Sequence, residues 1–347
     1  MQSINESAGD HRKSQHDCTA VGSVAVPSLG FGAAPIGNLY TSVTEDDAVA
    51  AVGEALACGI SFFDTAPYYG CGLSESRLRR GLSGHPRGSY AISTKVGRLV
   101  EEDASIGSGS DGFDISGRHA VFDYSRDGVL RSFESSLQRL GTDYVDILLL
   151  HDIGRLTHGA DHPSRMRQAL DEALPAMAEL KASGACGAIG IGVNEEAVCL
   201  ELMSLFTLDC IMLAGRYTLL EQAHSVRVMD EALRRSVAIL AAGPYNSGLL
   251  ASADGPGSTY NYGSVDKETH SRAQMIYDVC QAHDVDVGAA ALQFPLAHPA
   301  VATVVAGMRS VDEVREATKR VSAPLASSLW SDLRERGLLA AGAVAPS

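Results

Sequence analysis

Residues 60–70 of the chain read Ile60-Ser61-Phe62-Phe63-Asp64-Thr65-Ala66-Pro67-Tyr68-Tyr69-Gly70. The apolar run from Ile60 to Phe63 has the length of a strand that is buried on both faces. Pro67 and Gly70 prevent the chain after Asp64 from continuing as that strand. Asp64 and Tyr69 are therefore expected at the carboxyl edge of the strand, which in parallel α/β folds is the edge where ligands bind.

The same alternation of short apolar strands and amphipathic helices recurs on both sides of this stretch. A helix is predicted to begin after Thr44, which serves as the N-cap of an acidic first turn. Further strands are predicted at 90–95, 144–150, 188–191, 210–213, 237–241 and 302–305. Further helices are predicted at 74–82, 126–140, 164–182, 195–205, 225–235, 271–283 and 311–320.

Counted from an extended segment at 24–32, the pattern contains eight β/α units. It predicts an α/β fold, a (β/α)₈ TIM barrel with long βα loops. A doubly wound sheet with an appended domain is the alternative. The first strand is not followed by the Gly-x-Gly-x-x-Gly turn of a dinucleotide-binding Rossmann fold, which favours the barrel.

The expected domain organisation is simple. Residues 1–20 are predicted to be a disordered leader, 21–325 a single barrel domain and 326–347 a C-terminal tail. Three long connections, at 97–123, 152–163 and 246–270, leave the carboxyl ends of predicted strands. Long loops in compact domains are commonly functional, so these three are expected to wall a ligand pocket.

Composition excludes several classes of protein. The 347 residues carry a net charge of −14, which argues against nucleic acid or an anionic membrane as a partner. The seven cysteines are scattered without a Cys-x-x-Cys pair, which is typical of reduced thiols in a cytoplasmic protein. No apolar run reaches a membrane-spanning length. No metal site is predicted, and His158 and His162 are expected to be surface residues.

Four ionisable residues stand at the ends of predicted strands or directly after one: Asp64, Tyr69, Lys95 and His151. A lysine cation beside a tyrosine is expected to lower the pKa of the phenol. An aspartate would hold the lysine, and a histidine would orient a substrate oxygen. Each residue alone has an ordinary structural explanation, but four at neighbouring strand ends favour one site that moves a proton on or off a carbonyl or hydroxyl oxygen.

These residues fall in strings that resemble the aldo-keto reductase superfamily. The strings are Asp64-Thr65-Ala66-x-x-Tyr69-Gly70, Ser74-Glu75, Ser93-Thr94-Lys95 and Leu137-x-Arg139-Leu140-x-x-Asp143-Tyr144-Val145-Asp146-x-Leu148-x-Leu150-His151. The resemblance runs from about Leu29 to Arg320. It implies a barrel that binds NAD(P) without a Rossmann fold, with Asp64, Tyr69, Lys95 and His151 as catalytic tetrad and Tyr69 as the general acid/base.

Within the superfamily the chain is most similar to the aldose 1-dehydrogenases of the L-fucose (D-threo-aldose) and L-galactose type. The strings that carry this likeness are Phe122-Asp123-Tyr124-Ser125, His151-Asp152-Ile153-Gly154-Arg155, Gly192-Val193-Asn194-Glu195, Leu213-Ala214-Gly215-Arg216-Tyr217-Thr218-Leu219-Leu220-Glu221-Gln222 and Gly243-Pro244-Tyr245-Asn246-Ser247-Gly248. The likeness implies oxidation of the anomeric hydroxyl of an L-fucose, L-galactose or D-arabinose type sugar to its lactone. Oxidation of pyridoxal, reduction of aldehydes with NADPH, and a regulator that only senses its cofactor, as the potassium-channel β subunits do, are the alternatives.

The resemblance also implies cofactor residues. Asn194 would bind the nicotinamide carboxamide, and Tyr217 would stack on the ring unless it is a packed core aromatic. The loop residues Gly243, Pro244, Tyr245, Ser247 and Gly248 would approach the pyrophosphate. Cofactor choice is assigned to Gly307, Arg309 and Glu313, where the anion of Glu313 favours NAD and Arg309 keeps NADP as the alternative. Tyr68 is expected to wall the substrate pocket, and the oligomeric state is left open.

Overall fold

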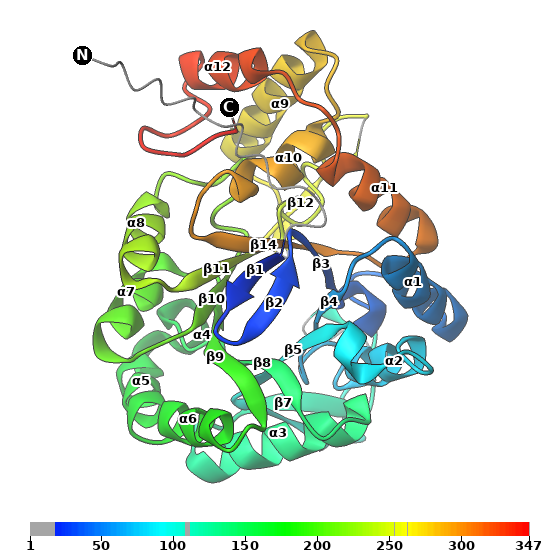
Figure 1. Cartoon of the computed structure of the whole chain (residues 1–347), viewed down its shortest axis with the longest axis vertical. Helices are drawn as coiled ribbons and strands as arrows, with labels where there is room; N and C mark the ends of the chain where they lie inside the picture. The colour runs from blue at the N-terminus through cyan, green and yellow to red at the C-terminus, as the bar shows by residue number, and fades with distance from the viewer. Residues whose placement is uncertain (1–17, 108–111, 253, 262, 347) are drawn as a thin grey trace, which may run out of the picture.

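The computed structural model of the protein describes residues 18–107, 112–252, 254–261 and 263–346. Eight parallel strands close into a barrel, which confirms the predicted TIM barrel (Figure 1). Their order around the barrel is β3 (Leu29–Gly32), β4 (Phe62–Asp64), β5 (Ala91–Val96), β8 (Val145–His151), β9 (Cys186–Val193), β10 (Cys210–Ala214), β11 (Ala238–Ala242) and β14 (Val301–Gly307). All carboxyl ends of parallel strands in a barrel meet at one mouth.

A ring of helices covers the outside of the barrel. Its members include α1 (Glu45–Ala57), α2 (Leu73–Gly81), α3 (Arg126–Leu140), α6 (Leu174–Ala182), α7 (Glu196–Leu205), α8 (Val226–Arg235), α10 (Val287–Leu296) and α11 (Val311–Val321). The Thr44 side chain accepts a hydrogen bond from the Asp47 amide at 3.1 Å, which confirms the predicted N-cap. The predicted helix at 164–182 is a continuous helical run: α5 (His162–Gln168), one π-helical turn at Ala169–Ala173, and α6.

The segment expected to be extended over 24–32 is two elements. Strand β2 (Val24–Pro27) pairs with β1 (Cys18–Val21) in an antiparallel hairpin, and β3 starts afterwards. The hairpin lies across the barrel in Figure 1, and its Val21, Val24 and Val26 pack with interior residues such as Phe62 and Leu149. The hairpin therefore plugs the end opposite the mouth. Residues 18–20 of the expected leader belong to β1, and residues 1–17 lie outside the described residues.

The two long helices α10 and α12 (Ser327–Glu335) were not predicted. The buried helix α10 contacts β14 and α11, whereas the predicted helix 271–283, observed as α9 (Lys267–Ala282), packs on α10 and α12. The expected C-terminal tail contains α12 (Ser327–Glu335), whose Trp330 is only 2% exposed. The tail is thus part of the packed structure at least as far as this helix.

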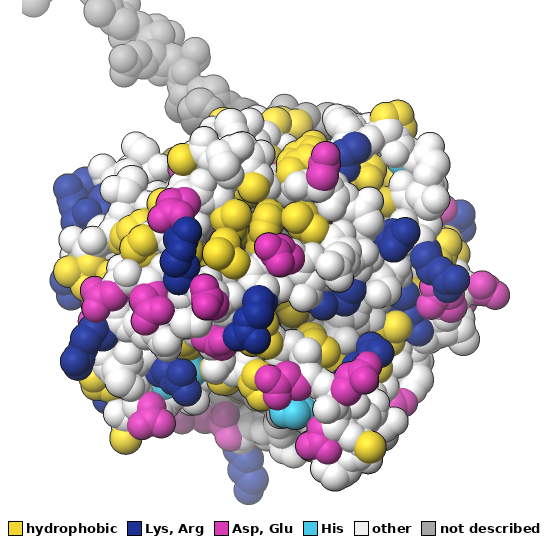
Figure 2. All heavy atoms as spheres, turned by 90° about the horizontal axis from the view of Figure 1, so that it is seen from below, with side chains coloured by type: hydrophobic (Ala, Val, Ile, Leu, Met, Phe, Trp, Pro, Cys, Tyr) yellow, Lys and Arg dark blue, Asp and Glu magenta, His cyan; other side chains and the backbone are white. Residues whose placement is uncertain are grey.

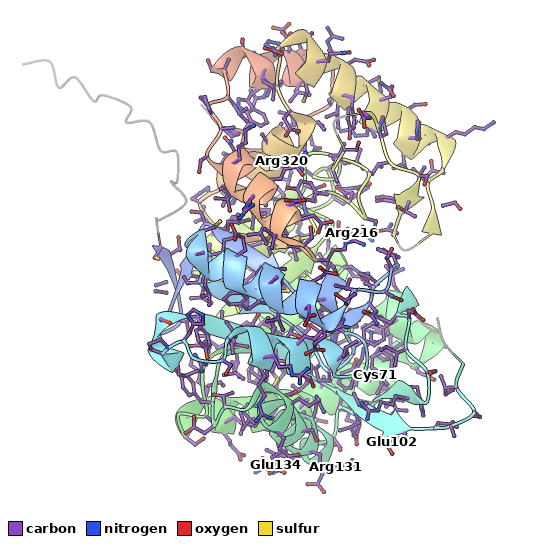
Figure 3. The ribbon with its side chains drawn as sticks, turned by 90° about the vertical axis from the view of Figure 1, so that its right-hand side faces the viewer. Cys71, Glu102, Arg131, Glu134, Arg216 and Arg320 are labelled. Atoms are coloured by element: carbon purple, nitrogen blue, oxygen red, sulfur yellow. The ribbon has the colours of Figure 1, made fainter. Side chains whose placement is uncertain are left out.

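The three long connections contain secondary structure of their own. The first forms the antiparallel pair β6 (Arg98–Glu102) and β7 (Arg118–Phe122), the second contains α4 (Arg155–His158), and the third contains the short pair β12 (Thr259–Tyr260) and β13 (Gly263–Ser264). Figure 3 shows Cys71, Glu102 and Arg216 toward the same side of the molecule, the side that carries the barrel mouth. The loops gather there.

The surface mixes charges of both signs. Over the face shown in Figure 2, acidic and basic side chains are interspersed around a group of hydrophobic ones. Among the described residues, no helix combines the length and the apolar character that crossing a bilayer would require.

Candidate active site

Three neighbouring strands and one turn bring Asp64, Tyr69, Lys95 and His151 together at the mouth. Asp64 ends β4, Lys95 lies on β5, and His151 ends β8. The Lys95 ammonium donates to both Asp64 oxygens, at 2.9 and 2.8 Å, and to the Thr65 carbonyl at 2.9 Å. The Tyr69 ring centroid lies 4.6 Å from Lys95 Nζ and 6.0 Å from the His151 ring.

The turn that carries Tyr69 depends on a close approach of two glycines. Gly70 has φ +62, and a Cβ on it would lie 2.3 Å from the carbonyl oxygen of Gly37. A side chain at either position would push the turn away from the loop after β3. Ser74 then fastens the turn, because its hydroxyl donates to the Ala33 carbonyl at 2.7 Å and lies 2.8 Å from the Thr65 hydroxyl.

The helix after the turn is held by a buried carboxylate. Glu75 is fully buried, and its two oxygens accept from the Thr94 hydroxyl at 2.7 Å and from Arg139 at 2.5 Å. Thr94 is the residue before Lys95, so the same contact ties α2 to β5. The Ser74-Glu75 string is thus connected to the Ser93-Thr94-Lys95 string through the hydrogen bond from Thr94 to Glu75.

Electrostatics in the site correct one sequence-based expectation. Burial, together with the negative charges of Asp64 and Asp152, raises the pKa of Tyr69 well above 10, so the net shift is opposite to the expected one. Burial is the main cause, and the Lys95 cation is directly paired with Asp64, whose charge offsets its effect on the phenol. Burial likewise raises the pKa of Asp64, while Lys95 and Ser93 oppose this rise. Burial and the cations of Arg98 and Lys95 lower the pKa of His151, so its imidazole is neutral.

Aromatic side chains line the approach to Tyr69. The Tyr68 ring centroid lies 6.0 Å from that of His151. Phe113, from the first long loop, stacks on Tyr69 at 6.1 Å and meets Tyr68 edge-on at 5.2 Å. Sequence analysis did not find Phe113, because only the loop as a whole could be assigned to the pocket.

A charged pair that the sequence did not reveal stands beside the four groups. Arg98 is hydrogen-bonded to the carboxylate of Asp152, the residue after His151. The Arg98 guanidinium carbon lies 3.9 Å from the Tyr68 ring centroid and 4.3 Å from that of Phe122. Asp152 has φ +51, a left-handed conformation that no sequence pattern predicted.

The loops after β9, β10 and β11 are joined to one another. Asn194 follows β9, and its carbonyl oxygen accepts from Arg216 at 2.8 Å. Asn246 and its neighbour Ser247 both have a left-handed backbone conformation. The Asn246 side chain accepts a hydrogen bond from the Thr218 hydroxyl at 2.7 Å and donates one to the Gly215 carbonyl at 3.1 Å. These contacts give the loop Gly243 to Gly248 a fixed shape, and its exposed Gly243 (φ +65) leaves room for a close ligand.

The structure corrects the stacking role assigned to Tyr217. This residue is only 1% exposed, and its ring packs at 5.5 Å from Phe294 of α10 and 5.6 Å from His298. It is the packed core aromatic of the alternative interpretation. Tyr245, from the loop assigned to the pyrophosphate, turns toward Arg320 near the C-terminal end of α11, and Pro244 is buried.

The segment assigned to cofactor choice contains an internal ion pair. The Arg309 Nε lies 3.2 Å from one Glu313 oxygen, and the Arg309 amide donates to the other at 2.8 Å. Gly307 is exposed directly before this segment, and Ser310 caps α11 through the Glu313 amide. Arg309 is thus already paired with a carboxylate.

The two loop histidines are more buried than expected. His162 is 7% exposed, with Nδ1 3.1 Å from the Ile153 carbonyl oxygen. His158 Nε2 lies 2.9 Å from the Tyr124 hydroxyl. Neither is a free surface residue, because both hold the loop after β8. No group of three or more potential metal ligands occurs within the described residues.

The parallel barrel and the cluster of Tyr69, Lys95, Asp64 and His151 at its mouth indicate an oxidoreductase of the barrel type. The model of the aldo/keto reductase family matches residues 28–336, and the chain belongs to that family. It is therefore an NAD(P)-dependent oxidoreductase.

Its relatives match over nearly their whole length. The chain is 37% identical to pyridoxal 4-dehydrogenase of Microbacterium luteolum, over 91% of this chain and 95% of that protein. It is 35% identical to D-threo-aldose 1-dehydrogenase of Pseudomonas sp (94% and 98%) and 32% identical to L-galactose dehydrogenase of Arabidopsis thaliana (84% and 83%). Among solved structures, an aldo-keto reductase from Bacillus halodurans in its holo form is similar with a TM-score of 0.73 and 26% identity, over 95% of this chain and 98% of that one.

Proposed function

We propose that this protein is an aldose 1-dehydrogenase that oxidises the anomeric hydroxyl of a sugar of the L-fucose, L-galactose or D-arabinose type to its lactone. The observation that carries the proposal is the placement of the Tyr69 ring between the Lys95–Asp64 pair and a neutral His151. The relatives named D-threo-aldose 1-dehydrogenase and L-galactose dehydrogenase support the choice of substrate class.

Each of the four groups has a role in this reaction. Tyr69, as the phenolate, takes the proton of the anomeric hydroxyl. His151 holds the same oxygen by a hydrogen bond. Lys95, 4.6 Å from the ring centroid, stabilises the phenolate once it forms, and Asp64 fixes the Lys95 ammonium in place. A nicotinamide bound at this mouth would supply the acceptor for the hydride that leaves C1.

The residues at the mouth fit NAD better than NADP. Asn194 and the loop from Gly243 to Gly248 form the rim at which the cofactor would bind. Glu313 already engages Arg309. A ribose 2′-phosphate would have to compete with the Glu313 carboxylate for that cation, whereas a 2′-hydroxyl could donate a hydrogen bond to the carboxylate.

Pyridoxal oxidation is the second candidate, because the relative named pyridoxal 4-dehydrogenase is as similar as the aldose enzymes. A regulator that only binds its cofactor is the third. In favour of an enzyme, His151 Nδ1 is buried without a partner among the described residues, as is Arg98 Nε, and both belong to the mouth. Unsatisfied buried polar atoms are costly unless they serve a ligand or a reaction.

The test is a screen of the purified protein. L-Fucose, L-galactose, D-arabinose and pyridoxal are each incubated with NAD and with NADP, and formation of reduced cofactor is followed. We expect turnover of at least one aldose with NAD. If pyridoxal alone is oxidised, the second candidate replaces the proposal. If none of the four substrates gives reduced cofactor, both functions are wrong.

A further inference from the structure

The Arg98–Asp152 pair is fixed at the mouth more firmly than an ordinary salt bridge. The guanidinium lies between the rings of Tyr68 and Phe122, at 3.9 and 4.3 Å from their centroids. The Tyr124 hydroxyl donates to the carbonyl of His151 at 2.8 Å, which holds the backbone next to Asp152. Both charged side chains are therefore held in one arrangement.

This pair adjoins the position of the reacting oxygen. The nearest Asp152 carboxylate oxygen lies 3.5 Å from His151 Nε2. A substrate oxygen that is hydrogen-bonded to His151 therefore has the Asp152 carboxylate as a neighbour. We expect the next oxygen along the substrate, on the carbon beside the reacting carbon, to be the group within reach of the pair.

The pair offers one acceptor and one donor. A carboxylate accepts hydrogen bonds and a guanidinium donates them, whereas a hydroxyl does both. A neutral hydroxyl is thus complementary to the pair, and the phenolate of a 3-hydroxypyridine aldehyde would meet the like charge of Asp152. We propose that Arg98 and Asp152 bind the C2 hydroxyl of the sugar and so select 2-hydroxy aldoses. The proposal rests on the proposed function and names the residues that set its specificity.

The experiment compares L-galactose with 2-deoxy-L-galactose in the wild type and in the nearly isosteric variant Asp152→Asn, with NAD as cofactor. A hydrogen bond to a charged group corresponds to roughly 10- to 100-fold in kcat/KM. We expect the wild type to prefer L-galactose by about this factor. Asp152→Asn should lower the ratio of kcat/KM for L-galactose to that for the deoxy sugar about tenfold. The ratio is compared at the pH optimum of each variant, because loss of the Asp152 charge also lowers the pKa of Tyr69 and affects both sugars alike.

Two further variants separate specificity from structure. Arg98→Lys keeps the charge but loses the planar guanidinium, so it should reduce the same preference. Glu54→Gln breaks a comparable pair with Arg315 on the outside of the barrel and should leave the preference intact. NAD affinity and circular dichroism confirm that each variant is folded.

Two results overturn the inference while the aldose activity stands. One is a wild type that oxidises both sugars equally well. The other is an equal loss on both sugars in Asp152→Asn and in Arg98→Lys, which would make the pair a purely structural link between β6 and β8. If the wild type oxidises no aldose at all, the proposed function itself fails.

Discussion

At the scale of single residues, the protonation of Tyr69 decides the chemistry. Its phenol is partly buried beside Asp64, and desolvation together with the Asp64 charge raises its pKa well above 10. The residue that should assist ionisation, Lys95, has its charge balanced by Asp64 at 2.8 Å. The free enzyme is therefore prepared to donate a proton at neutral pH and becomes a base only as the pH rises.

The direction of this shift gives a pH dependence. Oxidation requires the phenolate, so kcat/KM for the aldose should rise with pH through the alkaline range, whereas aldehyde reduction, which requires the phenol, should not rise there. His151 should add no step between about pH 6 and 8, because its pKa is lowered below that range. Steady-state pH profiles in both directions measure this.

Asp64→Asn tests the cause of the Tyr69 shift. The substitution removes one of the charges that raise the pKa of Tyr69, so the alkaline rise should move to lower pH even if the maximal rate falls. An unchanged position, or a move to higher pH, would contradict this account of the site.

Cofactor choice is also a residue-scale question. Glu313→Gln removes the anion that competes for Arg309, so the ratio of kcat/KM for NADP to that for NAD should rise about 3- to 10-fold, as expected for a partly exposed charge worth about 1 kcal/mol. Glu316→Gln, on the same helix and paired with Arg320, is the matched control. Equal ratios in both variants would disprove the role of Glu313.

At the scale of elements, some structure is readable in the sequence and some is not. The barrel strands are predictable because each is a short apolar run bounded by turn residues. Helix α10 was missed because all but one of its residues, Val287 to Leu296, are buried, so it shows no amphipathic period. Strand β2 was merged with β3 in the single segment 24–32, because an apolar run does not reveal where one strand ends and the next begins.

The same distinction applies to the site. Asp64, Lys95 and His151 were predictable, because a polar residue at the end of an apolar strand has to face the mouth. The Arg98–Asp152 pair was not predictable, since the contact depends on the pairing of β6 with β7 and on the left-handed backbone conformation of Asp152. The stacking role of Tyr217 came only from the family resemblance, and a matching string does not reveal whether the ring faces the ligand or packs against Phe294 and His298.

Helix α12 can be tested as an integral element of the barrel. Trp330 is 2% exposed and lies 6.4 Å from the ring of Phe294 in α10. Trp330→Ala should lower the free energy of unfolding by about 3–5 kcal/mol. Denaturation followed by circular dichroism measures it, because Trp330 is the only tryptophan. A loss below about 1 kcal/mol, similar to that of the half-exposed Leu233→Ala, would show that α12 is dispensable.

At the scale of the whole molecule, the two ends of the barrel have different tasks. The β1–β2 hairpin fills one end with valines, and the charged and aromatic groups gather at the other. Stability and chemistry are thus separated along the barrel axis, as in other TIM barrels. The match to relatives over nearly their full length means that no large part of those enzymes lacks a counterpart here.

The central claim is that Tyr69 transfers the proton, and Tyr69→Phe tests it most directly, because it removes one oxygen and keeps the ring that stacks on Phe113. The measurement is kcat for the best aldose together with the dissociation constant of NAD. The account predicts that kcat falls by about 10²- to 10⁴-fold while NAD binding is unchanged. A variant that turns over within a few-fold of the wild type would contradict it.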